Sequence, residues 1–149
     1  MREQFSEMLK TAMKAGDKRR VATVRMVQAA LKDRDIEART SGKPVGDEDI
    51  LALLQKLIKS RQESAEIYAK AGRPELEQQE REEIAIISEF LPAQLSADEV
   101  MAAIDAAIAE TGASGMKDMG KVVGLLRGKF AGQMDMAKAS SLVKAKLAG

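Results

Sequence analysis

Basic side chains gather near the end of the chain, where their spacing is suited to binding a polyanion. Residues 115–149 hold seven basic and two acidic side chains, a net charge of +5. Such side chains bind phosphates by charge and hydrogen bonds, with little readout of base sequence. An open alternative is that they form solvated helix faces. We expect phosphate contacts first from Lys117, Lys121, Arg127 and Lys129, and second from Lys138, Lys144 and Lys146.

Glycine recurs every four residues in the same segment, at Gly120, Gly124, Gly128 and Gly132. On a helix this spacing places the glycines near one stripe, and each interior glycine costs about 1 kcal/mol relative to alanine. Three explanations stay open. A neighbouring helix backbone packs close to the stripe, or Gly128 or Gly132 ends the helix, or a nucleic-acid backbone approaches the stripe. The interleaved cations exclude a membrane-helix dimer, which shares this spacing.

The residue types needed for several kinds of catalysis are missing. The chain has no histidine and no cysteine, so it has no Ser-His or Cys-His pair and no thiolate or imidazole metal ligand. Nothing matches the glycine-rich phosphate loop of nucleotide-binding enzymes. We therefore predict no catalytic residue, no metal site and no cofactor.

Acidic side chains gather in residues 75–89, with six acidic and one basic residue. We expect Glu80, Glu82 and Glu83 to lie on an exposed, solvated helix face. This interpretation is preferred over a metal site. Structural salt bridges are expected from a polar cluster of Arg61, Glu63, Arg73 and Glu80. A second hypothesis for the function is that the acidic helix binds a basic protein partner.

Apolar residues recur with helical spacing, and no stretch alternates as a strand would. We predict an all-α protein: a four-helix, bundle-like N-terminal part over residues 1–92 and a three-helix C-terminal domain over residues 93–149. The boundary follows Pro92, and Ser96 and Glu99 form a capping box just after it. The expected helices are 2–15, 18–38, 47–70, 74–91, 97–111, 116–130 and 136–147.

Charged residues at the N-terminus and the lack of a long apolar stretch predict a cytoplasmic protein with no membrane partner. The oligomeric state is not predicted by the sequence.

Three stretches carry a resemblance to a known family. They are Arg61-Gln62-Glu63-Ser64-Ala65-Glu66 with Ala71-Gly72-Arg73, then Glu89-Phe90-Leu91-Pro92-Ala93-Gln94-Leu95-Ser96, and then Asp118-Met119-Gly120-Lys121-Val122-Val123 with Gly132-Gln133-Met134-Asp135 and Leu142-Val143-Lys144. In this order they resemble the YqeY family of small bacterial proteins. The third stretch is also similar to the C-terminal tail of GatB, the tRNA-carrying subunit of the glutamine-dependent aspartyl/glutamyl-tRNA amidotransferase. Two positions depart from the pattern: Pro74 stands where an acidic residue is expected, and Gln133 where a basic one is common.

The resemblance implies a helical bundle joined to a three-helix tail domain. It also implies that the tail domain contacts the body of a tRNA, away from any chemistry. The resulting hypothesis is a non-catalytic tRNA-binding or amidotransferase-accessory protein, with the amidotransferase or other translation proteins as further partners. One alternative is a protein-interaction adaptor, in which the acidic helix binds a basic protein partner. The other is an auxiliary part of a carbon–nitrogen ligase that uses glutamine as amide donor. That function would be assigned to this chain only through the domain it shares with GatB.

Overall fold

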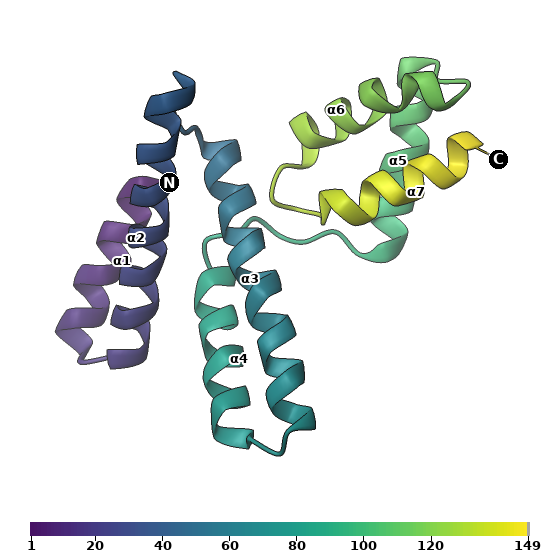
Figure 1. Ribbon diagram of the computed structural model, residues 1–149. Coiled ribbons are helices and arrows are strands. Elements are labelled where there is room, and N and C mark those ends of the chain that lie inside the picture. The colour runs from purple at the N-terminus through teal and green to yellow at the C-terminus, as the bar shows by residue number, and fades with distance from the viewer. Residues whose placement is uncertain (149) are drawn as a thin grey trace. The chain divides into compact units, whose positions relative to one another are not determined.

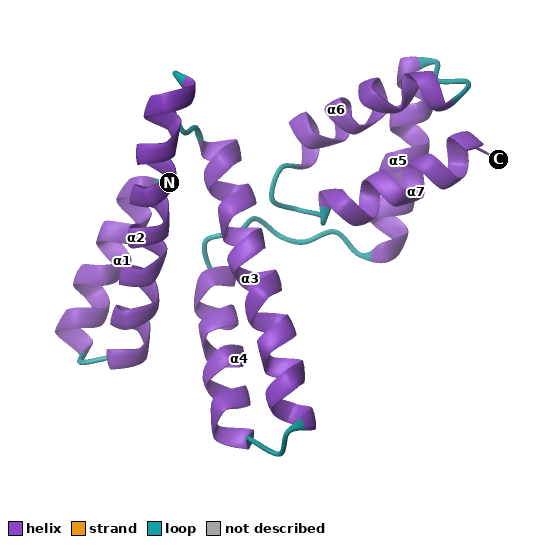
Figure 2. Ribbon diagram, viewed as in Figure 1, coloured by secondary structure: helices purple, strands orange, loops and turns teal. Residues whose placement is uncertain are grey.

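The computed structural model describes residues 1–148, and in this part of the chain it contains helices, turns and loops but no strand (Figure 2). The predicted all-α class is confirmed. The helices are α1 (Arg2–Ala15), α2 (Lys18–Ser41), α3 (Asp47–Lys70), α4 (Pro74–Ser88), α5 (Ala97–Thr111), the short 3-10 helix η1 (Met116–Asp118), α6 (Met119–Phe130) and α7 (Met136–Ala148).

The chain divides into two compact units, each with its own apolar core. The N-terminal unit is Met1–Leu91, and the C-terminal unit begins at Pro92. The last residue of the expected C-terminal domain, Gly149, lies outside the described residues.

The N-terminal unit is built from two helical hairpins, α1 with α2 and α3 with α4 (Figure 1). Helix α2 also packs against α4, which joins the hairpins. Val24 and Leu54 are fully buried in the shared core. Phe90, just past α4, packs edge-on against Phe5 of α1, with ring centroids 4.6 Å apart. Aromatic pairs in this arrangement add to the stabilisation from burial.

Helix ends follow the capping residues in the sequence. Asp17 accepts a hydrogen bond from the Arg20 backbone N–H and begins α2. Ser96 and Glu99 form the reciprocal bonds of the expected capping box, which begins α5. Gly16 ends α1 in the left-handed region, with φ of 70°. These caps satisfy backbone groups that a helix leaves unpaired at its ends.

Three expected helix boundaries are wrong by three residues. Helix α6 begins at Met119 rather than Met116, because residues 116–118 form the 3-10 helix η1. Helix α2 runs to Ser41 rather than Ala38, because the left-handed residue that stops it is Gly42. Helix α4 ends at Ser88 rather than Leu91, and the next three residues form tight turns. The N–H groups of Glu89, Phe90 and Leu91 each bond to a carbonyl three residues back, so the chain leaves the α-helical pattern at Ser88, before Pro92.

In the C-terminal unit, α5, α6 and α7 pack around Ile104, Val122, Leu126 and Val143. The extended segment before α5 is tied to this core. The Leu95 N–H donates to the Gln133 carbonyl at 2.9 Å, and Leu95 packs against the core. In the residues described, no helix combines the length and the apolar character that crossing a membrane requires.

Candidate nucleic-acid interface

Helix α6 has a core face and a glycine face. Val122 and Leu126 are buried in the core of the C-terminal unit. Because α-helices have 3.6 residues per turn, Gly120, Gly124 and Gly128 lie on the opposite, exposed side. These three glycines define what we call the glycine face.

The glycine face is open. A Cβ atom added at Gly120, Gly124 or Gly128 would meet no heavy atom within 4 Å. The expectation that a neighbouring helix packs close to these glycines is therefore wrong. Their cost in helix stability is not offset by packing inside the C-terminal unit. What remains is an exposed main-chain surface to which a partner's backbone can come close.

Gly132 does not belong to the glycine face. It lies beyond the end of α6 at Phe130, it is buried, and its φ of 76° is a left-handed value that glycine adopts most easily. Its carbonyl accepts a hydrogen bond of 2.6 Å from Nε2 of Gln94. The sequence left open whether Gly128 or Gly132 ends the helix. Gly128 lies inside α6, and Gly132 lies in the loop that follows the helix.

The turn before α6 is held by Asp118. Its carboxylate accepts the Ser114 backbone N–H at 3.0 Å. This bond is the main reason why the pKa of Asp118 is lowered, with smaller contributions from the charges of Lys121 and Lys117. Asp118 thereby fixes the short helix η1, which carries Lys117. Sequence reasoning named Asp118 only within a family motif. A capping signal would not have revealed its role, because Asp118 makes no side-chain capping bond to α6 and accepts instead from Ser114.

Five of the seven expected basic residues are exposed and form no ion pair with any described residue. Lys121 and Arg127 border the glycine face on α6 itself, and Lys117 precedes it on η1. The other two, Lys138 and Lys144, lie on α7. Lys117 and Lys121 lie near the charge of Asp118 but form no ion pair with it, so all five cations are available to an external anion at little cost.

The remaining two basic residues are ion-paired to α5. Lys129 Nζ lies 2.8 Å from Glu110 Oε2, and Lys146 pairs with Asp105. Residues 92–149 hold seven basic and six acidic side chains, so the whole C-terminal unit carries a net charge of only +1. The expected basic surface is therefore confined to η1 and to parts of α6 and α7, and α5 carries most of the opposing charge.

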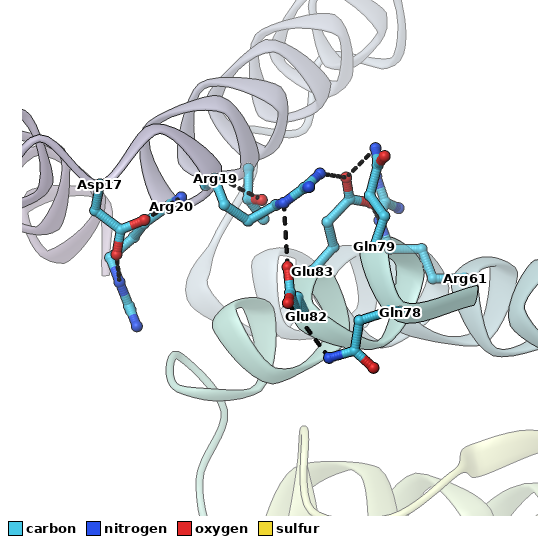
Figure 3. A network of polar contacts seen from close by, with 9 residues as sticks. Asp17, Arg19, Arg20, Arg61, Gln78, Gln79, Glu82 and Glu83 are labelled. Atoms are coloured by element: carbon cyan, nitrogen blue, oxygen red, sulfur yellow. Dashed lines mark hydrogen bonds and ion pairs between the residues drawn. The ribbon is translucent and has the colours of Figure 1, made fainter. Parts of the chain in front are cut away.

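The acidic helix α4 presents only part of the exposed face that the sequence predicts: Glu82 is exposed as expected, whereas Glu80 and Glu83 are half-buried. Glu83 is 17% exposed and accepts a hydrogen bond of 3.0 Å from Arg61 of α3. Arg19 of α2 lies 3.3 Å from Glu82 and 4.0 Å from Glu83. Figure 3 shows these side chains converging from three helices. Arg61 thus pairs with Glu83, a residue outside the expected cluster of Arg61, Glu63, Arg73 and Glu80. The observed cluster links the two hairpins.

Other carboxylates of α4 are also used within the unit. Glu77 pairs with Arg81 at 2.8 Å, and Glu89, which follows the helix, pairs with Arg20. Within residues 1–148, no group of three or more acidic side chains is arranged to hold a metal ion.

Comparison with known proteins places the whole architecture in one family. A family model described as "Yqey-like protein" matches residues 2–147. This match covers both units, including the linker and the turn that precedes α6.

Two curated relatives are fungal. A protein of Eremothecium gossypii named "Altered inheritance of mitochondria protein 41, mitochondrial" is 34% identical over 104 residues, which are 68% of this chain and 56% of the relative. A protein of the same name from Lachancea thermotolerans is 36% identical over 83 residues, which are 56% of this chain and 43% of the relative. The chain thus spans about half the length of these relatives.

Proposed function

The chain belongs to the Yqey-like protein family, and on this premise we propose that it is a non-catalytic RNA-binding protein whose C-terminal unit holds the backbone of structured RNA, with tRNA as the first candidate. The resemblance of the Met119-Gly120-Lys121-Val122 segment to the tail of a tRNA-carrying amidotransferase subunit supports this choice. An accessory role beside that amidotransferase is part of the same proposal.

The observation that carries the proposal is the open glycine face with its two bordering cations. Gly120, Gly124 and Gly128 keep the surface of α6 bare, while Lys121 and Arg127 stand beside it without internal ion pairs. A sugar–phosphate backbone lying along α6 can approach the helix main chain and meet both charges. Phosphate contacts of this kind give affinity that falls steeply with salt.

Structured RNA fits this surface better than single strands do. Single-strand binding relies on aromatic side chains on which bases stack. Phe130 is the one aromatic residue in residues 92–149, and it packs against the core of the C-terminal unit. Recognition through shape and phosphates is the mode that RNA helices favour.

The alternatives have less support. The protein-interaction adaptor relied on a free acidic helix, but Glu82, Glu83 and Glu89 are engaged in ion pairs within the N-terminal unit. No observation on the described residues favours a part in a carbon–nitrogen ligase. The cytoplasmic location stays a prediction, and both fungal relatives carry "mitochondrial" in their names.

A titration of bulk tRNA into the full chain tests the proposal. The test variant, which we call the α6 variant, is Lys117→Gln/Lys121→Gln/Arg127→Gln. The matched control, the α3 variant, is Lys56→Gln/Lys59→Gln/Lys70→Gln, which removes three exposed cations from the other unit. Glutamine keeps helix propensity in both variants.

We expect wild-type binding to weaken with salt. The slope of log K against log salt should become shallower by about 2 in the α6 variant, because each lost phosphate contact removes about 0.7 to 0.9. The α3 variant should change the slope by much less. Equal losses in both variants, or no wild-type binding at about 50 mM salt, would overturn the proposal.

A further inference from the structure

Helix α2 carries a second row of cations, far along the sequence from α6. Lys18, Arg25, Lys32 and Arg39 follow one another at intervals of seven residues, and all four are exposed. We call this row the α2 ridge. Seven residues are close to two helical turns, so the four side chains share one face of the helix. At 1.5 Å per residue, neighbouring cations are about 10 Å apart and the ridge is about 32 Å long.

The α2 ridge lies opposite the core face of its helix. Val24, Val27 and Leu31 are buried on the inner side. Between the cations the outer side carries Ala22 and Ala29, which are small, and a single larger apolar residue, Ile36. The ridge is thus a straight line of charge with short side chains between the charges.

The ridge cations are unpaired, whereas the other basic residues of α2 are not. Arg19, Arg20 and Arg34 each form an ion pair with a carboxylate of the N-terminal unit. Within residues 1–148, no ion pair is found for Lys18, Arg25, Lys32 or Arg39.

The acidic groups nearest to the ridge in sequence do not neutralise it. The Asp35 carboxylate is bonded by both terminal nitrogens of Arg2, at 2.8 and 2.9 Å, and Glu37 pairs with Arg34. Asp33 points away from the ridge by about a quarter turn, given the helical periodicity. The hydrogen bonds from Arg2 are the main cause of the lowered pKa of Asp35; Arg39 contributes a smaller electrostatic effect but forms no ion pair with Asp35. The row therefore keeps most of its positive charge for an external polyanion.

We propose that the α2 ridge is a second RNA-binding surface, which contacts the phosphate backbone of the RNA that the C-terminal unit holds. This inference rests on the proposed function and extends it to the N-terminal unit. The four regularly spaced cations act as phosphate contacts without base readout. The small residues between them leave room for a backbone.

A phosphate backbone fits the ridge better than a bilayer or a protein does. A helix that lies in a membrane interface buries an apolar face there, but the apolar face of α2 is already buried in the core. A protein interface is built around an apolar centre depleted in charge, and the ridge has only Ile36 to offer.

The linker favours a single RNA for both units. Leu91 packs against the core of the N-terminal unit, and Leu95 against that of the C-terminal unit. Only Pro92, Ala93 and Gln94 lie between these anchors. A tether this short raises the effective concentration of one binding surface for a ligand held by the other.

The test compares full-length variants in the bulk-tRNA titration. The ridge variant is Lys18→Gln/Arg25→Gln/Lys32→Gln/Arg39→Gln. Its control, with the same change in charge, is Lys56→Gln/Lys59→Gln/Lys70→Gln/Arg73→Gln, from exposed positions on α3 and just before α4. A third variant, Arg25→Lys/Arg39→Lys, keeps the charge of the ridge. Circular dichroism and melting curves establish that every variant is folded.

We expect the ridge variant to bind tRNA at least about 10-fold more weakly at low salt, with a salt slope shallower by about 3. The control and the charge-keeping variant should stay within about 3-fold of wild type. Equal effects in the ridge variant and its control would overturn the inference. If wild type binds tRNA, the α6 variant loses binding and the ridge variant does not, the inference fails while the proposed function stands.

A second experiment, with lipid vesicles, tests whether the α2 ridge binds a membrane instead of RNA. Vesicles with about 30% anionic lipid are sedimented with each variant. We expect no binding that depends on the ridge. Ridge-dependent binding to vesicles together with unchanged tRNA binding would assign the ridge to membranes and overturn the inference.

Discussion

Lys129 Nζ of α6 lies 2.8 Å from Glu110 Oε2 of α5, so one cation of the basic segment is held by a carboxylate of the same unit. Both side chains are about half exposed, and such a pair contributes at most about 1 kcal/mol to stability. Its larger effect is to neutralise one positive charge on the surface that is proposed to bind RNA.

Replacing Glu110 should therefore strengthen RNA binding. In Glu110→Gln, Lys129 becomes available and one repulsive charge disappears, so we expect tRNA affinity at low salt to rise about 2- to 5-fold. The control is Asp98→Asn, which changes the net charge equally near the start of α5. Fluorescence anisotropy measures both. An equal gain in both variants would mean that net charge alone, and not the release of Lys129, sets the affinity.

Gly132 and Gly124 should respond in opposite ways to alanine. Gly132 has a left-handed backbone, where a Cβ costs about 1–2 kcal/mol, so Gly132→Ala should lower the free energy of unfolding by that amount. Gly124 is helical with open space around it, so Gly124→Ala should raise the free energy of unfolding by about 0.5–1 kcal/mol. Urea denaturation measures both. A loss of stability at Gly124 would show that its Cβ meets an obstacle.

Glu83 should matter for stability and not for RNA. It accepts hydrogen bonds from Arg61 and Gln79 and lies close to Arg19, so Glu83→Gln should destabilise the N-terminal unit by about 1–3 kcal/mol. Glu66→Gln, at an exposed position of α3, is the control and should change stability little. Unchanged stability in Glu83→Gln would contradict the structural role of the cluster.

Asp118 should make the stability of the C-terminal unit depend on pH. The pKa of Asp118 is lowered from its ordinary value of 3.8 by the Ser114 N–H, so the charged form stabilises the fold. This stability is present above the ordinary pKa and is lost as the pH falls through the lower, folded value. Asp118→Asn should therefore be less stable than wild type at neutral pH, and the difference should shrink below about pH 4. Urea denaturation from pH 7 to 3 measures the difference in stability between the two proteins. A difference that grows on acidification would contradict the prediction.

The fold could be predicted largely from local signals. Asp17, Gly16, Ser96 and Pro74 each act at one helix end, through bonds to nearby residues or through their own backbone preferences. Such signals depend on a few residues and are readable without the tertiary structure. The end at Ser41 lies before Gly42, which also marks a helix end in the sequence. The end at Ser88 comes from tight turns that begin before Pro92 and that no single residue type marks.

The candidate site was only partly predictable, because the state of each side chain depends on distant residues. The sequence assigns a charge to Lys129, but its pairing with Glu110 is set by how α5 packs on α6. The same holds for Glu83, which looks exposed until α2 and α3 are placed beside α4. The seven-residue spacing of Lys18 and Arg25 is present in the sequence, but their lack of an ion partner among the described residues depends on how α2 packs within the N-terminal unit.

The most direct measurement of the central claim is the tRNA affinity of Gly124→Leu. Leucine keeps the helix and adds bulk without charge at the centre of the glycine face, where the RNA backbone is proposed to lie. Ala102→Leu, at an exposed position of α5, is the matched control. The account predicts that Gly124→Leu binds bulk tRNA at least about 10-fold more weakly while its melting temperature does not fall, and that the control binds like wild type. Wild-type affinity in a folded Gly124→Leu protein would contradict the account.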